Sequence, residues 1–164
     1  MSERPPQLVS VTCPRCGNQF AAPILNVLDV GRHPEFKAML LQGRLNVAAC
    51  PQCGTSGMLN VPFVYHDPGK ELLFAFTPNT LNLTSDVQQR LIGDMTNAII
   101  NSIPPEQRKA YLLQPKIFLT LPSLVEAILQ ADGVTPEMLE AQRAKSRLVE
   151  QFLQVSDELE LQAL

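Results

Sequence analysis

A five-residue phrase occurs twice in this chain, as Cys13-Pro14-Arg15-Cys16-Gly17 and again as Cys50-Pro51-Gln52-Cys53-Gly54. The four cysteines of the sequence all lie inside these two copies. Two Cys-x-x-Cys pairs supply four thiolates, which is the ligand set of a closed tetrahedral Zn²⁺ site. The glycine after each pair can adopt the positive φ that turns backbone N–H groups toward a bound sulfur. The repeat therefore predicts one metal site, made of Cys13, Cys16, Cys50 and Cys53.

Three chemistries use such cysteine pairs, and the rest of the chain helps to separate them. Structural zinc is favoured, because four thiolates leave no open position for water or substrate. Iron in the same four-sulfur shell would make a rubredoxin-like electron carrier, but rubredoxins are smaller and pack an aromatic core. A thiol–disulfide active site would need a βαβ pattern beside the pair, which neither copy has. We therefore expect structural Zn²⁺, with iron as the less favoured metal.

The residues around the cysteine pairs predict short strands. Residues 8–12 alternate apolar and polar side chains and lead into the first pair, and residues 19–22 return as their partner. Residues 45–49 lead into the second pair in the same way. Between the pairs, residues 33–41 predict a helix with Pro34 near its first position. This inserted helix accounts for the long separation of the two pairs.

A hairpin is predicted next, and helices follow it. Residues 58–65 and 71–76 read as strands around a turn that contains Pro68 and Gly69. Beyond residue 80 the apolar period changes from two to about 3.6 residues, which indicates helices. Ser123 with Glu126 predicts the capping box of one of them.

Two domains are expected from this change of period. Residues 1–80 are predicted to form a zinc-binding, zinc-ribbon-like antiparallel β unit with an inserted helix, and residues 81–164 a helical region. The fold class is therefore α+β.

The last helix, which opens at Thr135-Pro136-Glu137, is predicted to run to the end of the chain. Its apolar residues follow alternating steps of three and four, which is a heptad-like seam. The seam consists of Met138, Ala141, Lys145, Leu148, Phe152, Val155 and Leu159. An amphipathic helix folded back on the domain would explain it, and so would a helix that binds a protein partner or a second copy.

Composition and charge narrow the classes of function. The net charge is −3 with a pI near 5.4, and the basic residues of the first half are scattered along the sequence. Nucleic acid is therefore a disfavoured partner. No apolar run is long enough to span a membrane, and the first residues lack a signal-peptide pattern, so we expect a cytoplasmic protein. Because aromatic residues make up only 5%, we expect a core of Leu, Ile, Val and Ala.

The histidines and acidic residues suggest no catalytic site. His33 precedes the first helix. His66 precedes the hairpin turn, where we expect it at the surface or next to the metal ligands. Either could in principle replace a metal ligand, but four cysteines already complete the shell. The sequence has no nucleophile elbow, phosphate-binding loop or His-Glu-x-x-His motif. We therefore expect no enzymatic activity.

The chain resembles the CpXC domain family of bacteria and archaea, which is named for two Cys-Pro-x-Cys motifs. The resemblance covers residues 10–80 and rests on the doubled motif, on His33-Pro34-Glu35-Phe36 and on Tyr65-His66-Asp67. It implies that the four shared cysteines are metal ligands and that the setting is a prokaryotic cytosol. It implies no reaction, and no role for Tyr65-His66-Asp67.

These observations predict a noncatalytic zinc-binding module that mediates protein interaction or assembly, with the last helix as its contact. The alternative from another class is a nucleic-acid-binding zinc ribbon with a regulatory role. A rubredoxin-like iron electron carrier is the third possibility.

Overall fold

The computed structural model describes the backbone of residues 6–162 and the side chains of residues 6–149 and 151. The chain divides into two compact units, Met1–Val125 and Glu126–Leu164. Strands and helices are both plentiful, so the fold is α+β, as predicted. Within the described part of the chain, no helix is both long enough and apolar enough to cross a lipid bilayer.

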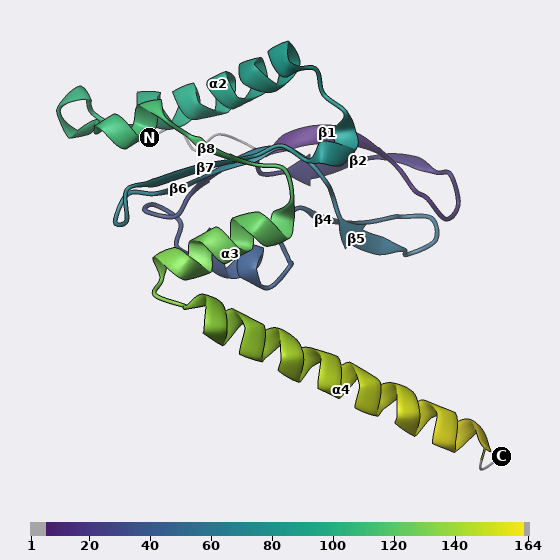
Figure 1. The fold of residues 1–164 in the computed structure, drawn as a ribbon. Helices are drawn as coiled ribbons and strands as arrows, with labels where there is room; N and C mark the ends of the chain where they lie inside the picture. The colour runs from purple at the N-terminus through teal and green to yellow at the C-terminus, as the bar shows by residue number, and fades with distance from the viewer. Residues whose placement is uncertain (1–5, 163–164) are drawn as a thin grey trace. The chain divides into compact units, whose positions relative to one another are not determined.

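Each cysteine pair lies in the turn of its own two-stranded antiparallel ribbon (Figure 1). β1 (Gln7–Thr12) pairs with β2 (Gln19–Ile24) around the first cysteine pair. β4 (Val47–Ala49) pairs with β5 (Ser56–Met58) around the second. These ribbons confirm the zinc-ribbon-like arrangement that the alternating residues before each cysteine predict.

The segment between the ribbons contains the predicted helix and an additional strand. α1 (Glu35–Leu41) has Pro34 as its N-cap residue and buries Leu40. The chain leaves the helix through Gly43, whose φ of 66° is a conformation that glycine adopts without strain. α1 packs against β3 (Val27–Asp29), a strand that the sequence did not predict.

The largest sheet of the first unit has the strand order β3-β6-β7-β8. β6 (Phe63–Asp67) and β7 (Leu72–Phe76) form the antiparallel hairpin that the Pro-Gly turn predicts. β3 adds to β6 in parallel, and β8 (Lys116–Phe118) adds to β7 in parallel. The first arm of the hairpin is shorter than predicted, because Met58 belongs to the second cysteine ribbon instead.

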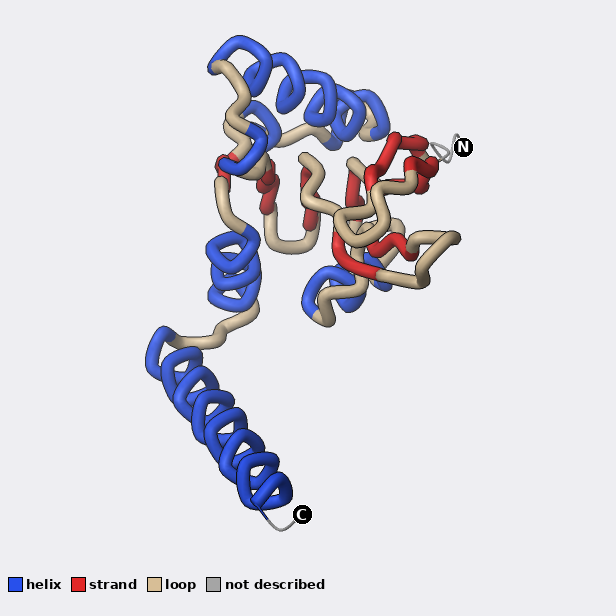
Figure 2. Tube along the Cα trace, turned by 90° about the vertical axis from the view of Figure 1, so that its right-hand side faces the viewer, coloured by secondary structure: helices blue, strands red, loops and turns tan. Residues whose placement is uncertain are grey.

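Helix α2 (Ser85–Ser102) covers one face of this sheet (Figure 2). Thr84 caps the helix, and its hydroxyl oxygen accepts a hydrogen bond from the backbone N–H of Val87. Alternate residues of β6 and β7 face the helix, since successive side chains of a strand point to opposite faces. The buried cluster that results comprises Val64, Leu73, Ala75, Ile92, Met95, Ile99 and Leu112.

The opposite face of the sheet is aromatic. The other alternate residues of β6 and β7, with one from β8, are Phe63, Tyr65, Phe74, Phe76 and Phe118, all buried. The ring centroids of Phe63 and Phe76 are 5.1 Å apart, and those of Phe74 and Phe118 are 5.0 Å apart. The expectation of a core without aromatic residues was therefore wrong, because most of the few aromatics are concentrated in one layer.

Short 3₁₀ turns join the longer elements of the first unit. η1 (Asn79–Leu81) precedes α2, while η2 (Pro105–Gln107) and η3 (Ala110–Leu113) follow it. Pro104 and Pro105 follow the end of α2, since a proline cannot continue the ladder of helical hydrogen bonds. η3 returns the chain to the sheet and buries Leu112 under α2.

Helix α3 (Leu121–Ala131) begins in the first unit and ends in the second, which also contains α4 (Pro136–Gln162). The predicted capping box does not form. Ser123 lies inside α3, where its hydroxyl donates to the carbonyl oxygen of Thr120. α3 ends at Ala131, and the chain turns away through Gly133, whose φ is 91°.

The predicted last helix is present as α4. The hydroxyl of Thr135 caps it by accepting a hydrogen bond from the backbone N–H of Met138. Arg143 of α4 forms an ion pair with Glu126, within the same unit. The predicted seam is exposed where it is described, with Met138 at 58% and Leu148 at 66%. The side chains of Phe152, Val155 and Leu159 lie outside the described residues.

The division of the chain differs from the predicted boundary between residues 80 and 81. The break between the two units falls at Val125/Glu126. β8 and α2, which follow residue 80, belong to the first unit because they pair with β7 and pack on β6.

Candidate metal centre

The two cysteine pairs have the same backbone geometry. The N–H of Gly17 donates to the carbonyl oxygen of Cys13 at 2.9 Å, and Gly54 donates to Cys50 at the same distance. The φ angles of Gly17 and Gly54 are 73° and 75°. Both glycines therefore occupy the left-handed conformation that their place after each pair predicts.

The ribbons bring all four cysteine sulfurs to one place. The Sγ atoms of Cys13 and Cys53 are 3.5 Å apart, and those of Cys16 and Cys50 are 3.6 Å apart. All four Sγ atoms lie within 4.8 Å of one another. A tetrahedral site with Zn–S bonds of about 2.3 Å places its sulfurs about 3.8 Å apart. The four sulfurs therefore have the spacing of a four-thiolate metal site.

The sulfurs are partly closed off from solvent and have polar side chains beside them. Cys13 and Cys50 are buried, while Cys16 is exposed. The side-chain amide nitrogen of Asn18 lies 3.9 Å from the Cys50 sulfur. The hydroxyl oxygen of Thr55 lies 3.3 Å from the Cys53 sulfur. Such N–H and O–H groups stabilise negative charge on sulfur.

The acidity of the thiols shows why this shell suits a cation. Backbone N–H groups, chiefly that of Cys53 and also that of Gln52, lower the pKa of Cys50 to about 6 against the effect of burial. A backbone hydrogen bond at Asn18 favours the thiolate of Cys16, but burial and the neighbouring sulfurs outweigh it and raise the pKa of Cys16 to about 12. Sulfurs this close ionise together only when a cation neutralises them.

The two histidines take no part in this cluster. Among the described residues, the one group of His, Cys, Asp and Glu close enough to share a metal consists of the four cysteines. His33 forms a hydrogen bond with Glu35 at the start of α1. His66 is only 1% exposed, so the expectation of a surface residue was wrong. It lies within β6, and the hairpin continues beyond it to Asp67.

His66 is the centre of a polar network that the sequence did not predict. Its Nε2 atom lies 2.8 Å from the hydroxyl oxygen of Tyr111 in η3, and its Nδ1 atom lies 3.4 Å from a carboxylate oxygen of Asp29 in β3. With a proton on Nδ1 facing the carboxylate, Nε2 accepts the hydrogen bond from the Tyr111 hydroxyl. The network joins two strands of the main sheet to η3.

Charges around the network shift the acidity of its members. Burial raises the pKa of Asp29, but its interaction with His66, with help from Gly31 and Arg32, lowers it overall below its ordinary value. Burial, and then the charge of Glu71, raise the pKa of Tyr111. The carboxylate of Asp29 is thus stabilised in the folded protein, and the Tyr111 hydroxyl keeps its proton.

No sequence motif identifies this network in advance. The resemblance drew attention to Tyr65-His66-Asp67, which lies in β6. The partners of His66, however, lie 37 positions before it and 45 positions after it in the sequence. Only the placement of β3 and η3 beside β6 brings the three side chains together.

Comparison with known proteins supports one assignment. No curated protein matches the chain, and no solved structure does either. The family model of CpXC proteins matches residues 11–143, which is well over half of the 164 residues. The matched region includes all four clustered cysteines and the His66 network. The chain therefore belongs to the CpXC family.

Proposed function

We propose that this protein is a noncatalytic zinc-binding module that mediates protein interaction or assembly. The observation that carries the proposal is the cluster of four sulfurs within 4.8 Å of one another, contributed in pairs by two separate ribbons. Four thiolates fill a tetrahedral Zn²⁺ shell and leave no position for a substrate or a reactive water. The metal's role would then be to hold the ribbons together.

The ribbons need such a link because β1, β4 and β5 bury no residue, while β2 buries only Ala22 and Ile24. In β1, no residue is fully buried, and Leu8 is 69% exposed. An isolated two-stranded ribbon is at best marginally stable in water. Metal binding supplies folding free energy directly when the site exists only in the folded state. This need supports a structural metal over a catalytic one.

Helix α4 is the proposed contact with a protein partner or a second copy. Met138, Leu148 and Val149 are each more than half exposed, within a helix that carries the heptad-like seam. Exposed apolar side chains repeated along one helix are typical of an association surface. A reducing cytoplasm is the compartment in which four free thiols would remain available to a metal.

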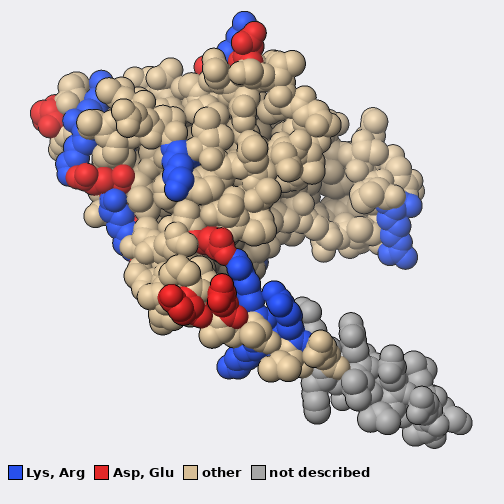
Figure 3. Space-filling view, viewed as in Figure 1, with Lys and Arg blue, Asp and Glu red and all other residues tan. Residues whose placement is uncertain are grey.

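A nucleic-acid-binding zinc ribbon is the alternative from another class. On the face in Figure 3, several Lys and Arg side chains gather at the left edge of the first unit with acidic side chains among them, and the others lie singly. Binding to a phosphate backbone requires a continuous basic surface. Because acidic side chains interrupt the basic ones, the surface favours a protein partner over a nucleic acid.

The test of the metal is elemental analysis with an absorption spectrum, on protein purified without added metal. One zinc per chain without visible bands is the expected result. Iron with visible charge-transfer bands would instead make the protein a rubredoxin-like electron carrier. Absence of any metal from the folded protein would contradict the proposal.

The test of the helix compares two glutamate variants by light scattering after size-exclusion chromatography. Leu148→Glu places a charge in the seam, while Ser146→Glu places the same charge outside it on the same helix. If α4 mediates self-association, only the first variant should lower the mass. If the wild-type protein is monomeric, the contact would be with a different protein. Such a partner should bind to the Ser146→Glu variant but not to Leu148→Glu. Salt-sensitive binding to DNA or RNA would favour the alternative.

A further inference from the structure

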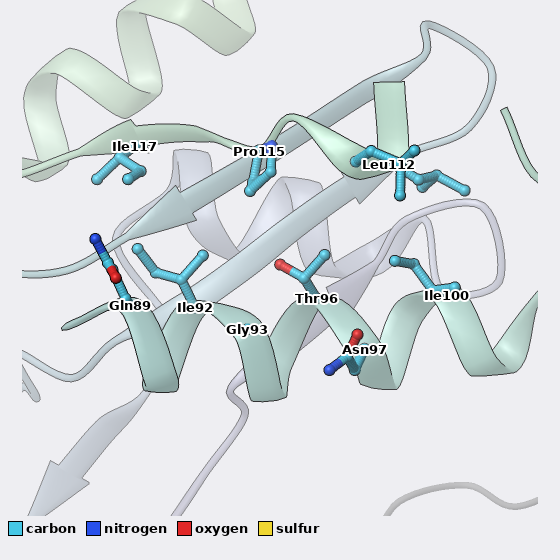
Figure 4. Close-up of a pocket in the computed structure, with 10 residues that line it drawn as sticks. Gln89, Ile92, Gly93, Thr96, Asn97, Ile100, Leu112, Pro115 and Ile117 are labelled. Atoms are coloured by element: carbon cyan, nitrogen blue, oxygen red, sulfur yellow. The ribbon is translucent and has the colours of Figure 1, made fainter. Parts of the chain in front are cut away.

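A cavity of about 310 Å³ lies in the first unit between α2 and the segment that contains η3 and β8 (Figure 4). None of the residues that line it is one of the four cysteines or a member of the His66 network, although η3 contributes to both the pocket and the network. Ile92 and Ile100 of α2 form one wall, and Leu112, Pro115 and Ile117 form the other. The volume is at the lower end of the range of about 300–1,000 Å³ that small-molecule pockets occupy.

The lining of this pocket carries no charge. Besides the apolar residues, it includes the side-chain amides of Gln89 and Asn97, on α2. No Lys, Arg, Asp, Glu or His is among the residues that line it. An ionic ligand would lose its hydration here without gaining a partner, so the pocket selects against charge.

The pocket contains a buried polar group without a partner. Thr96 is 7% exposed, and its hydroxyl has no hydrogen bond to any described residue. Figure 4 shows the side chain of Thr96 pointing from α2 toward Pro115, into the pocket. Buried hydroxyl groups are normally hydrogen-bonded, since leaving one unsatisfied is costly. A ligand with one hydroxyl or carbonyl group would satisfy it.

A glycine keeps the middle of the pocket open. Gly93 lies within α2, where glycine is less favourable than alanine. A Cβ atom at this position would meet nothing within 4 Å, and its φ is not positive. Neither the packing nor the backbone of the chain itself requires a glycine here. Its absent side chain leaves the helix backbone accessible from the pocket.

We propose that this pocket binds a small, neutral and mostly apolar molecule with one hydroxyl or carbonyl group, which hydrogen-bonds to Thr96. The volume admits a ligand of one or two small rings, since a cavity of about 150 Å³ already holds benzene. The uncharged lining excludes carboxylates and amines. Because Thr96 has one unpaired hydroxyl, the ligand needs one polar group to pair with it. This binding site is independent of the metal centre and of α4.

Three probes of similar size test the proposal on the full-length, metal-loaded protein. Benzyl alcohol has one hydroxyl, ethylbenzene replaces that hydroxyl by a methyl group, and benzoate carries a charge. Titrations followed by amide NMR shifts should show both neutral probes acting on residues 89–100 and 112–117. Benzoate should leave those shifts unchanged.

Two substitutions assign the binding to the pocket. Thr96→Val keeps the shape and removes the hydroxyl, so the ratio of the ethylbenzene Kd to the benzyl alcohol Kd should fall about fivefold to tenfold. Gly93→Ala should weaken both neutral probes while the thermal midpoint stays equal or rises. Asp94→Ala, an exposed change on the same helix, should leave binding unchanged.

Three results would overturn the proposal. One is the absence of amide NMR shifts with either neutral probe at millimolar concentration. The pocket would then more readily accept an apolar side chain of a partner protein. A second is binding of benzoate as tight as that of benzyl alcohol. The third is an unchanged Kd ratio in Thr96→Val.

Discussion

The Nε2 atom of His66 lies 2.8 Å from the hydroxyl oxygen of Tyr111, although 45 residues separate them in the sequence. His66 belongs to the hairpin that follows the cysteine ribbons, and Tyr111 belongs to the turn that follows α2. Their two rings are nearly parallel, with centroids 6.0 Å apart. This contact ties the segment after residue 80 to the strands before it, so neither part completes the first unit without the other.

Tyr111→Phe should destabilise the protein by about 1–2 kcal/mol, because it leaves the buried Nε2 atom of His66 without its hydrogen-bond partner. Urea denaturation with the metal bound would measure the change. Lys109→Gln is the control, since it removes only an exposed ion pair with Glu71 and should have little effect. Equal stability of Tyr111→Phe and wild type would show that the network contributes nothing.

Asp29 should make stability depend on pH in the acid range. Its pKa is lower in the folded protein than its ordinary value of 3.8. The stability that it contributes is therefore fully present above the unfolded pKa and is lost as the pH falls through the folded pKa. Denaturation of Asp29→Asn, measured between about pH 6 and pH 3, should show a shallower loss of stability than wild type. Asp94→Asn should follow the wild-type curve, and an identical curve for Asp29→Asn would contradict the prediction.

Cys53→Ser should abolish stoichiometric metal binding and destabilise the protein by several kcal/mol, because metal binding and folding are coupled. Metal content and thermal unfolding would be measured on the same sample. Thr55→Val removes the hydroxyl next to the Cys53 sulfur and should retain the metal. A Cys53→Ser protein of wild-type stability would refute a structural role for the site.

Gly54→Ala should cost about 1–2 kcal/mol, because alanine is strained at a φ of 75°. The cost would be purely conformational, since an added Cβ meets no atom within 4 Å. Gly57→Ala is a matched control three residues away, in equally open space but without a positive φ, and should change stability by less than about 0.5 kcal/mol. Equal effects of the two variants would exclude the conformational explanation.

The sequence was sufficient wherever the signal is local. The doubled Cys-Pro-x-Cys-Gly phrase predicts two turns of one geometry, and Gly17 and Gly54 adopt nearly equal φ angles. The period of two before the cysteines predicts their ribbons, and Thr84 and Thr135 cap the helices that the longer period predicts. Each of these features depends on residues within a few positions of one another, so pattern and propensity are enough.

Other features lack a local signal. The spacing of Ser123 and Glu126 predicts a capping box, but α3 begins two residues before Ser123. The Ser123 hydroxyl therefore donates a hydrogen bond to the carbonyl oxygen of Thr120 instead. β3 and β8 are three residues each, too short for any alternation to be read. They become strands because parallel partners in the hairpin satisfy their backbone groups.

The sequence by itself determined the cysteine ribbons, the order of the main helices and the CpXC family, because these depend on residue type at fixed spacing. Only the tertiary structure decided that the first unit extends to Val125, that His66 is buried and that Thr96 faces a pocket. Those outcomes depend on contacts between segments far apart in the chain. Burial is a property of what packs around a residue, and a residue's neighbours in sequence do not specify it.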